Sequence, residues 1–575
     1  MGADLDQQVG MTEATTQQSE IADEGLVEQL KHFSRPFWIA NLMEMLERLA
    51  YYGLRTVLPI YMVLSIEEGG PQFSHIQKGA IYMWWAAVQS GLPIFTGGYA
   101  DRYGYKLTVA VSIAIKIIGY LGMAYALEIA SALSGGASVG VPGHDAAFWV
   151  FGVGAMFLAA GTAVFKPGLQ GIIAVNLDNK RASLGWSVFY QLVNVGGFLG
   201  PILAGVMRLM AWKWVFISCA VIVSLNYLFL LTFEEPAGKN VQDSGSDRPN
   251  FLRVLWDSSV GILEPRLFAF LVIFSGFWMM FHQLFDLLPN FIDDWVDSRG
   301  VIDVLVRPIF EAVGGNIPAQ WHGNLPQEYM INVNAGMCML LAFIIGYWTG
   351  KIRSMVAMIG GILISAAAIY ALGLSSNGWS TILAIAAFSL GELMASPTKM
   401  RYFGSIAPAG KKGLYMGYIN ATGGIGWAIG SHIAGKMYEA DGDKVVLARR
   451  YLVNNLQQGA EQVAALPKTA VIPRLAELTH KTADVEVRQL LWDTYHPQEI
   501  WAHFALIGVI SMCGLIAFDL VTRSKLSQWR EWAVLLGLTF VTSSLCYSWS
   551  HGFVFAALMG VWLLLRRFAP KVLPA

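Results

Sequence analysis

The residues best suited to chemistry are charged side chains that interrupt otherwise apolar stretches. Glu44, Glu47 and Arg48 lie within one such stretch, three and four positions apart. On a helix, this spacing places all three side chains on one face. Ionised groups are costly in hydrocarbon, and by default they mark function there. We therefore expect the cluster to face a polar cavity, where Arg48 holds a carboxylate ionised until a proton or a ligand changes the balance.

Two further isolated charges, Lys166 and Glu392, lie in other apolar stretches. A carboxylate paired with a cation binds protons weakly, whereas one that loses its partner in a dry environment binds them more strongly. An anionic ligand that competes for Arg48 or Lys166 would therefore free a glutamate to take up a proton. Ligand binding would then be coupled to proton binding. The alternative is a set of structural ion pairs that hold helices together.

The amino-acid composition indicates whether the chain folds in water or in a lipid bilayer. Of the 575 residues, 55% are hydrophobic and 14% are charged, and the mean hydropathy is +0.49. This leaves too little polar surface to coat a soluble protein of that length. The formal net charge is −1 and no long basic run is present, which argues against nucleic acid or an electrostatically held membrane surface as partner. A chain that spans the lipid bilayer is predicted.

No residue pattern indicates catalysis or a bound cofactor. The four cysteines all fall in apolar stretches, and none forms a metal-type pair; we interpret them as packing residues. No metal-ligand spacing and no nucleophile–base pair is recognisable, so the sequence predicts neither an enzyme nor a metal site nor a cofactor. Residues 1 to about 30 lack a basic start and an apolar core, which argues against a cleavable signal peptide. A cytoplasmic tail over residues 1–36 is predicted instead.

Apolar stretches long enough to cross the hydrocarbon, about 20 residues each, divide the chain into about fourteen spans. The last two are short and read as an appended hairpin. The predicted spans lie near 37–63, 78–100, 107–131, 147–176, 184–207, 213–233, 266–290, 329–350, 354–375, 379–402, 414–437, 499–522, 532–549 and 551–567.

Short loops rich in Lys and Arg fall on one side of the membrane if the amino terminus is cytoplasmic, as the positive-inside rule requires. Both termini are then cytoplasmic, and an inner or plasma membrane is the expected location. The turn after the second span, residues 97–106, contains Asp101 and Arg102 and has a weaker counterpart at residues 346–353. Equivalent inner loops indicate a duplicated fold. The first turn resembles the loop motif of the major facilitator superfamily, in which two halves rock about a central site.

The fold class expected from this pattern is all-α: a polytopic membrane protein with two six-helix halves and an additional carboxy-terminal hairpin. The expected domains are a cytoplasmic tail, an N-terminal bundle, a cytoplasmic linker, a C-terminal bundle with two outer inserts, and the hairpin with a cytoplasmic end. Their bounds are 1–36, 37–233, 234–265, 266–522 with inserts 291–328 and 438–498, and 523–575.

A narrower resemblance is carried by several motifs in order. Residues 44–53, Glu-Met-Leu-Glu-Arg-Leu-Ala-Tyr-Tyr-Gly, resemble the ExxER motif of proton-dependent oligopeptide transporters, the POT family. Single motifs of this kind are weak, but their order and helix placement together are specific, and the match covers most of the membrane part. The other matching segments are Phe165-Lys166-Pro167, residues 187–197, Phe277-Trp278 with Gln283, Val333-Asn334-Ala335, and Gly391-Glu392 with Ser396-Pro397.

The resemblance implies roles for these residues. Proton coupling falls to Glu44, Glu47, Arg48 and Lys166. Arg55 and Lys166 would hold a peptide carboxylate, Glu392 its amino group, and Asn194 and Asn334 its backbone. A zwitterionic peptide needs cations at one end and an anion at the other, so this division is chemically consistent. The substrate-binding set implied in full is Tyr51, Tyr52, Arg55, Lys166, Asn194, Trp278, Asn334, Glu392 and Ser396, with Asp101 and Arg102 as the conformational motif.

Two departures from the family pattern affect this assignment. His282 stands where family members commonly have an acid, and Asp286 follows at i+4. Asp286 could replace that acid or orient the imidazole, and a histidine that titrates near neutrality suits a proton relay; a cavity histidine without a coupling role is the alternative. Ser90 stands where the family usually offers a pocket tyrosine, and Lys116 has no evident role.

The function that the resemblance implies is proton-coupled import of di- and tripeptides by alternating access. The expected partners are short peptides, protons and the lipid bilayer, with the chain acting as a monomer. One alternative keeps the fold but carries a non-peptide solute, such as an organic anion or an amphipathic compound. A second alternative is a receptor whose outer loops bind a partner; the buried charges argue against it, because an inert anchor has no need of them.

Overall fold

The computed structural model describes residues 26–135, 146–177, 182–234, 256, 259–406, 412–482 and 485–568. This part of the chain is helical, with one isolated β-bridge between Asp297 and Asn377. Most of the predicted amino-terminal tail and of the predicted linker lies outside the described residues. The all-α membrane fold expected from the sequence is confirmed.

Long helices of 19 residues or more occupy the positions of the predicted spans. Along the chain they are α3 (Arg35–Val63), α4 (His75–Tyr103), α5 (Tyr105–Ala124), α7 (Ala146–Val175), α8 (Ala182–Met210), α9 (Trp212–Leu230), α11 (Pro265–Asp286), α15 (Gln327–Gly350), α16 (Ser354–Leu372), α17 (Gly378–Ile406), α18 (Lys412–Asp441), α23 (Glu499–Arg523), α24 (Gln528–Cys546) and α25 (Trp549–Phe568). Within the described residues, 10 helices are apolar and long enough to cross a membrane by composition alone. The others, α3, α4, α18 and α24, carry more charged or polar residues.

Two predicted spans are interrupted. The stretch 107–131 divides at Tyr125 into α5 and the short α6 (Ala126–Leu133). The stretch 266–290 ends as α11 at Asp286, and a second helix, α12 (Leu288–Trp295), begins after Leu287. Pro289 explains the second break, because a proline lacks the amide hydrogen and its ring clashes with the carbonyl four residues earlier.

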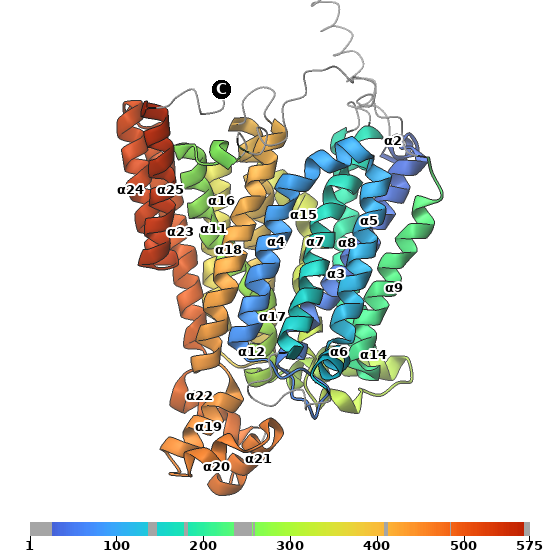
Figure 1. Ribbon diagram of the computed structural model, residues 1–575. Coiled ribbons are helices and arrows are strands. Elements are labelled where there is room, and N and C mark those ends of the chain that lie inside the picture. Colours follow the sequence, from blue (N-terminus) through green and yellow to red (C-terminus); the bar gives the residue numbers. More distant parts are fainter. Residues whose placement is uncertain are drawn as a thin grey trace, which may run out of the picture.

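The described helices form two halves, each with its own apolar core. One core is built from α3, α4, α5, α7, α8 and α9, and the other from α11, α15 to α18 and α23. Trp427 of α18 is an exception, since it packs in the core of the first half. Across the interface α4 lies against α18, and α8 lies against α15. Figure 1 shows these helices as one upright bundle.

Short helices gather at one end of the bundle, which we call the insert side. They belong to the two predicted inserts and are α12, α13 (Arg299–Val301), a π-helical turn (Ile302–Val306), α14 (Arg307–Ala312), a 3-10 turn (Ala319–Trp321), α19 (Lys444–Asn454), α20 (Ala460–Ala464), α21 (Lys468–Thr479) and α22 (Glu486–Tyr495). In Figure 1 the domain α19–α22 projects below the bundle, at the end opposite to α2 (Leu26–Lys31).

The final two helices, α24 and α25, attach to the second half alone. They pack against α11 and α23, at one edge of the bundle in Figure 1. Arg266 of α11 fixes this hairpin, since its Nε and Nη2 contact the two carboxylate oxygens of Glu531 at 2.5 and 2.7 Å. Paired contacts of this type are directional as well as strong.

Glycine permits the closest approach of the halves on the insert side. A Cβ atom at Gly435 of α18 would lie 2.4 Å from the carbonyl oxygen of His75, and one at Gly79 of α4 would lie 2.5 Å from that of Ser431. Both distances are well inside van der Waals contact, and both obstacles are main chain. Here α4 and α18 can meet only where neither has a side chain.

Candidate functional site

The predicted charged cluster of α3 is present, and it has a fourth member. Arg48 Nε contacts Glu44 Oε1 at 2.8 Å, and Arg48 Nη2 contacts Glu47 Oε2 at 2.6 Å. The other oxygen of Glu47 accepts a hydrogen bond from Lys116 Nζ of α5 at 2.8 Å. Lys116 is fully buried, and its ammonium lies 3.6 Å from the centre of the Phe165 ring. Lys116, which the sequence left unexplained, completes a cluster of two acids and two cations.

Lys166 of α7 lies beside this cluster. It is within electrostatic reach of Arg48, Glu44 and Glu47, but it forms no ion pair among the described residues. Its side chain is half-buried. The first half therefore holds a neutral set of paired charges together with one cation that has no carboxylate of its own.

Glu392 occupies the corresponding place in the second half, in the middle of α17. Its Oε2 accepts a hydrogen bond from Asn334 Nδ2 of α15 at 2.8 Å and lies 3.9 Å from Cys338 Sγ. Tyr52 of α3 and Tyr190 of α8 lie within electrostatic reach of this carboxylate. The glutamate thus faces the first half, and it has hydrogen bonds but no cationic partner in the described part of the chain.

Arg55 and Asp286 join the two halves directly. The guanidinium of Arg55 hydrogen-bonds to one carboxylate oxygen of Asp286 and lies over the rings of Tyr82 and Trp427, at 4.2 and 4.9 Å from their centres. Trp427 Nε1 and Ser431 Oγ donate to the other oxygen of Asp286 at 3.0 and 2.5 Å. Asp286 is thereby occupied by these groups, and the imidazole of His282 is not among its hydrogen-bond partners in the described structure.

An aromatic wall extends from this ion pair into the second half. The ring of His282 stacks on Trp427 at 4.9 Å between centres, and Trp278 follows at 5.9 Å from His282. Within the described residues, Trp278 Nε1 is buried without a hydrogen-bond partner. On the opposite side, the Asn194 amide of α8 lies within reach of Tyr190. Buried donors are almost always satisfied, so Trp278 Nε1 is a candidate for contact with a bound solute or with water.

The remaining predicted site residues make fewer contacts in the described structure. Tyr51 donates to Gln89 Oε1 at 3.3 Å, and Ser396 is half-buried on α17. The side chains of Asp101 and Arg102, at the end of α4, fall outside the described residues. No group of three or more metal-type ligands occurs among the described side chains.

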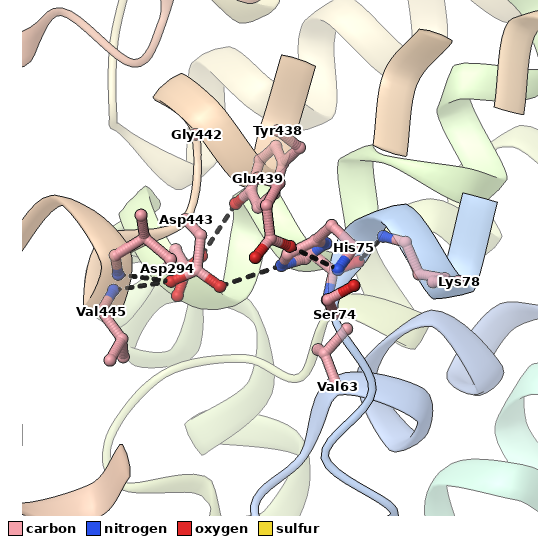
Figure 2. A network of polar contacts seen from close by, with 12 residues as sticks. Val63, Ser74, His75, Lys78, Asp294, Tyr438, Glu439, Gly442, Asp443 and Val445 are labelled. Atoms are coloured by element: carbon pink, nitrogen blue, oxygen red, sulfur yellow. Dashed lines mark hydrogen bonds and ion pairs between the residues drawn. The ribbon is translucent and has the colours of Figure 1, made fainter. Parts of the chain in front are cut away.

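The insert-side seam is a network between the halves that sequence reasoning missed (Figure 2). We use this name for the contacts of His75 and Lys78 in α4 with the second half. His75 Nε2 contacts Asp443 Oδ2 at 3.0 Å, and its amide donates to Glu439 Oε2 at 2.6 Å. Lys78 Nζ donates to Asn290 Oδ1 at 2.5 Å. In the sequence, the signal that could have identified this site is the position of His75 and Lys78 near the start of an apolar helix.

The seam contains one carboxyl group that titrates near neutrality. Asp294, in α12 outside the spanning helices, accepts a hydrogen bond from Tyr438 Oη at 2.8 Å. Burial raises the pKa of Asp294 to about 7, and the charge of Asp443 contributes in the same direction. The pKa of Asp443 itself lies well below its usual range despite burial, because His75 and two backbone amides of α19 hydrogen-bond to its carboxylate.

Most hydrogen bonds and ion pairs between the described parts of the two halves lie on the insert side. Besides the seam and Arg55, they include Asn290 with Pro59, Gln327 with Thr56, Arg208 with Glu328 and Lys468 with Val63. Gln191, which donates to the Met339 carbonyl at 3.2 Å, lies deeper, near the middle of the helices. These contacts close the insert side of the bundle over the charged residues.

Comparison with known proteins adds a family match. The model of the Major Facilitator Superfamily matches residues 40–431. Curated relatives include the multidrug resistance protein MdtH of Klebsiella pneumoniae, 21% identical over 72% of this chain and 89% of the relative, and MdtH of Edwardsiella ictaluri, 22% identical over 68% and 84%.

Solved structures share the fold at low sequence identity. A POT family transporter in complex with 5-aminolevulinic acid has a TM-score of 0.53 and 17% identity, covering 78% of this chain and 96% of that one. A peptide transporter POT in complex with sulfate has a TM-score of 0.52 and 19% identity, covering 81% and 95%. The nucleoside transporter NupG has a TM-score of 0.55 and 14% identity, covering 84% and 100%.

Proposed function

Because this chain belongs to the Major Facilitator Superfamily, we propose that it is a proton-coupled symporter of the POT type that imports di- and tripeptides. The observation that carries the proposal is the distribution of charges between the halves. Lys166 and the Arg48 cluster lie on one side, and the carboxylate of Glu392 lies on the other. A peptide with a carboxylate at one end and an ammonium at the other is complementary to that arrangement.

The ion-pair cluster supplies the proton step of this proposal. Glu47 is held by both Arg48 and Lys116, and Lys166 adds positive potential from α7. When a peptide carboxylate approaches Lys166, it offsets part of that positive potential. The carboxylates of the cluster then bind a proton more readily, and the substrate and the proton travel together.

Alternating access follows from the position of the contacts between the halves. In the proposed topology both termini are cytoplasmic and the insert side is outside, in an inner or plasma membrane. The insert-side contacts then seal the outer end, so that this conformation faces the cytoplasm. Breaking the bond of Arg55 to Asp286 and the seam around His75 would open the site outward.

The proposal is tested with purified protein in liposomes. An inward proton gradient is expected to drive accumulation of labelled Ala-Ala. Glu47→Gln should abolish the gradient-driven accumulation while gradient-free exchange partly survives, because exchange needs binding but no net proton movement. Glu128→Gln is the matched control, since Glu128 pairs with Lys213 on an exposed surface. Failure of both di- and tripeptides to accumulate or compete would overturn the peptide assignment.

A second candidate substrate is an amphipathic organic compound, carried by the same fold. The aromatic wall of Trp278, His282 and Trp427 and the similarity to MdtH multidrug resistance proteins favour it. Ligands that bind only the folded protein raise its unfolding temperature. A thermal-shift screen of peptides against amphipathic organic anions therefore separates the two candidates: stabilisation by the latter alone would favour the second.

A further inference from the structure

One buried cation of the second half has no role in the transport scheme above. Lys399 of α17 is 5% exposed. Its ammonium lies 4.4 Å from the centre of the Trp278 ring and 5.6 Å from that of Phe274, both on α11. Its one hydrogen bond among the described residues, to Thr422 Oγ1 of α18, is long at 3.4 Å. No carboxylate pairs with Lys399 in the described part of the chain.

The direction of this side chain is unusual for a lysine near a helix end. Lys399 lies seven residues before Ile406, where α17 ends on the side away from the inserts. A lysine in such a position commonly extends its ammonium outward to water. Side chains on a helix tilt toward its N-terminus, and α17 begins on the insert side. The ammonium of Lys399 therefore points back into the bundle, to the face of Trp278.

Lys399 and Glu392 lie on the same face of α17. Seven residues complete almost two helical turns, with a drift of about 20°, and the rise between them is about 10 Å. Both side chains lean toward the N-terminus of α17, so the two charged groups stay about that far apart. An extended dipeptide is long enough to contact both.

Apart from Lys78 in the insert-side seam, three charges at the candidate site have no ion-pair partner in the described structure. Lys166 and Lys399 are cations, and Glu392 is an anion; in the described structure none of them has an opposite charge within ion-pair distance. Arg48 and Arg55, by contrast, are fully engaged by Glu44, Glu47 and Asp286. A zwitterionic peptide with a neutral side chain matches Lys166 and Glu392, and it leaves Lys399 uncompensated.

We propose that Lys399, with Trp278, forms a subsite for a second anionic group of the substrate, and that the protein prefers peptides with an acidic side chain. The proposal rests on the proposed peptide transport. A side-chain carboxylate would pair with the Lys399 ammonium, and its aliphatic stem would lie against Trp278. The unpartnered Nε1 of Trp278 is an additional donor at the same place.

The first test needs no variant. Labelled Ala-Ala uptake into liposomes is measured under a fixed proton gradient, with Ala-Glu or its neutral isostere Ala-Gln as competitor. Ala-Glu is expected to inhibit at about tenfold lower concentration than Ala-Gln, because one charge-assisted contact is worth about that factor. Equal inhibition, or stronger inhibition by Ala-Gln, would overturn the subsite. Absence of Ala-Ala uptake would overturn the peptide function instead.

The second test assigns the preference to the lysine. Lys399→Gln should remove the advantage of Ala-Glu over Ala-Gln as a competitor of Ala-Ala uptake, whereas Lys399→Arg should retain the advantage. Lys436→Gln is the matched control, because Lys436 is an exposed lysine of α18. An advantage that survives Lys399→Gln, or an equal loss for both competitors, would contradict the proposal. The unfolding temperature of each variant confirms that it is folded.

Discussion

Glu44, Glu47, Arg48 and Lys116 form a closed network in which each ionised group has a partner. Taking such charges out of water is expensive, and the expense is offset only when all of them are paired. Removal of one member leaves the network with one buried charge that is not compensated. The network is therefore sensitive to the gain or loss of a single proton, which is the property a coupling site needs.

Pairing within this network can be measured by a double-mutant cycle. Lys116→Met is expected to lower the free energy of unfolding by about 3 kcal/mol, because Glu47 loses a buried partner. Combining it with Glu47→Gln should recover part of that loss, since the network is then neutral again, with Arg48 paired to Glu44. The measurement is thermal unfolding of the detergent-solubilised single and double variants. Strictly additive effects would show that Lys116 and Glu47 do not interact energetically.

The insert-side seam provides a prediction about pH. The pKa of Asp294 is raised to about 7 in the folded protein, from an ordinary value of 3.8. Between these values the unfolded chain loses the proton and the folded chain keeps it, so the contribution of Asp294 to stability falls as pH rises from 4 to 7. In Asp294→Asn this slope should be reduced when unfolding temperature is followed across that range. Asp493→Asn, at an exposed position of α22, is the control and should retain it.

At the scale of single residues, the sequence predicted which charged side chains lie in the site but not which groups they contact. The i, i+3 and i+4 spacing in α3 was sufficient for Arg48 with Glu44, whereas Lys116 reaches Glu47 from another helix, at a depth that only packing defines. Lys399 was overlooked because a lysine near a helix end is ordinarily solvated. The expected relation between His282 and Asp286 did not anticipate that Arg55, Trp427 and Ser431 would occupy that carboxylate.

Among the helices, α4 and α18 determine how tightly the insert side closes. Their backbones approach at Gly79 and Gly435, where any Cβ would meet a carbonyl oxygen of the other half. The polar contacts of His75 with Asp443 and Glu439 lie next to this approach. Closure therefore depends on Gly79 and Gly435, which let the two backbones approach each other. It also depends on the hydrogen bonds of His75 that this approach makes possible.

A single methyl group should weaken this closure. Gly435→Ala places a Cβ against the His75 carbonyl, so α4 and α18 must separate on the insert side. Spin labels on the insert-side ends of the halves should then report a longer mean distance by double electron–electron resonance. Gly423→Ala is the matched control on the same helix, since a Cβ there has nothing within 4 Å. An unchanged distance in Gly435→Ala would mean that the helices do not limit closure.

Helix positions were more predictable than helix ends. Apolar length located each long helix, because crossing hydrocarbon requires it. The break at Leu287 could have been predicted from Pro289. Hydropathy alone predicted a span that continues to residue 290. The break at Tyr125 between α5 and α6 had no such marker, since no proline or glycine lies at that position.

The whole molecule combines two halves with two additions, the domain α19–α22 and the hairpin α24–α25. The domain is a small helical unit with its own buried leucines and valines, among them Leu447, Leu475 and Leu491. It also contacts the first half, because Lys468 Nζ donates to the Val63 carbonyl at 2.7 Å. The domain is therefore placed to influence closure without lining the charged site.

Removal of this domain tests whether transport needs it. We expect a chain in which a Gly-Ser linker of about ten residues, able to span about 30 Å, replaces Lys444–Tyr495 to retain Ala-Ala uptake, because the charged site is built from other helices. Lys468→Gln is the smaller control, which removes the contact with Val63 and the positive charge near Asp443. Loss of uptake by a shortened chain that remains folded and monodisperse would show that the domain takes part in the cycle.

The hairpin α24–α25 makes the two halves unequal. It packs on α11 and α23 of the second half and is tied there by Arg266 and Glu531. The second half consequently has a larger surface in contact with lipid. When both halves rotate by the same angle, the second half must displace more of the surrounding lipid. For the same torque the second half therefore meets more resistance from the bilayer than the first. In the proposed rocking motion, the first half is expected to move through the larger angle.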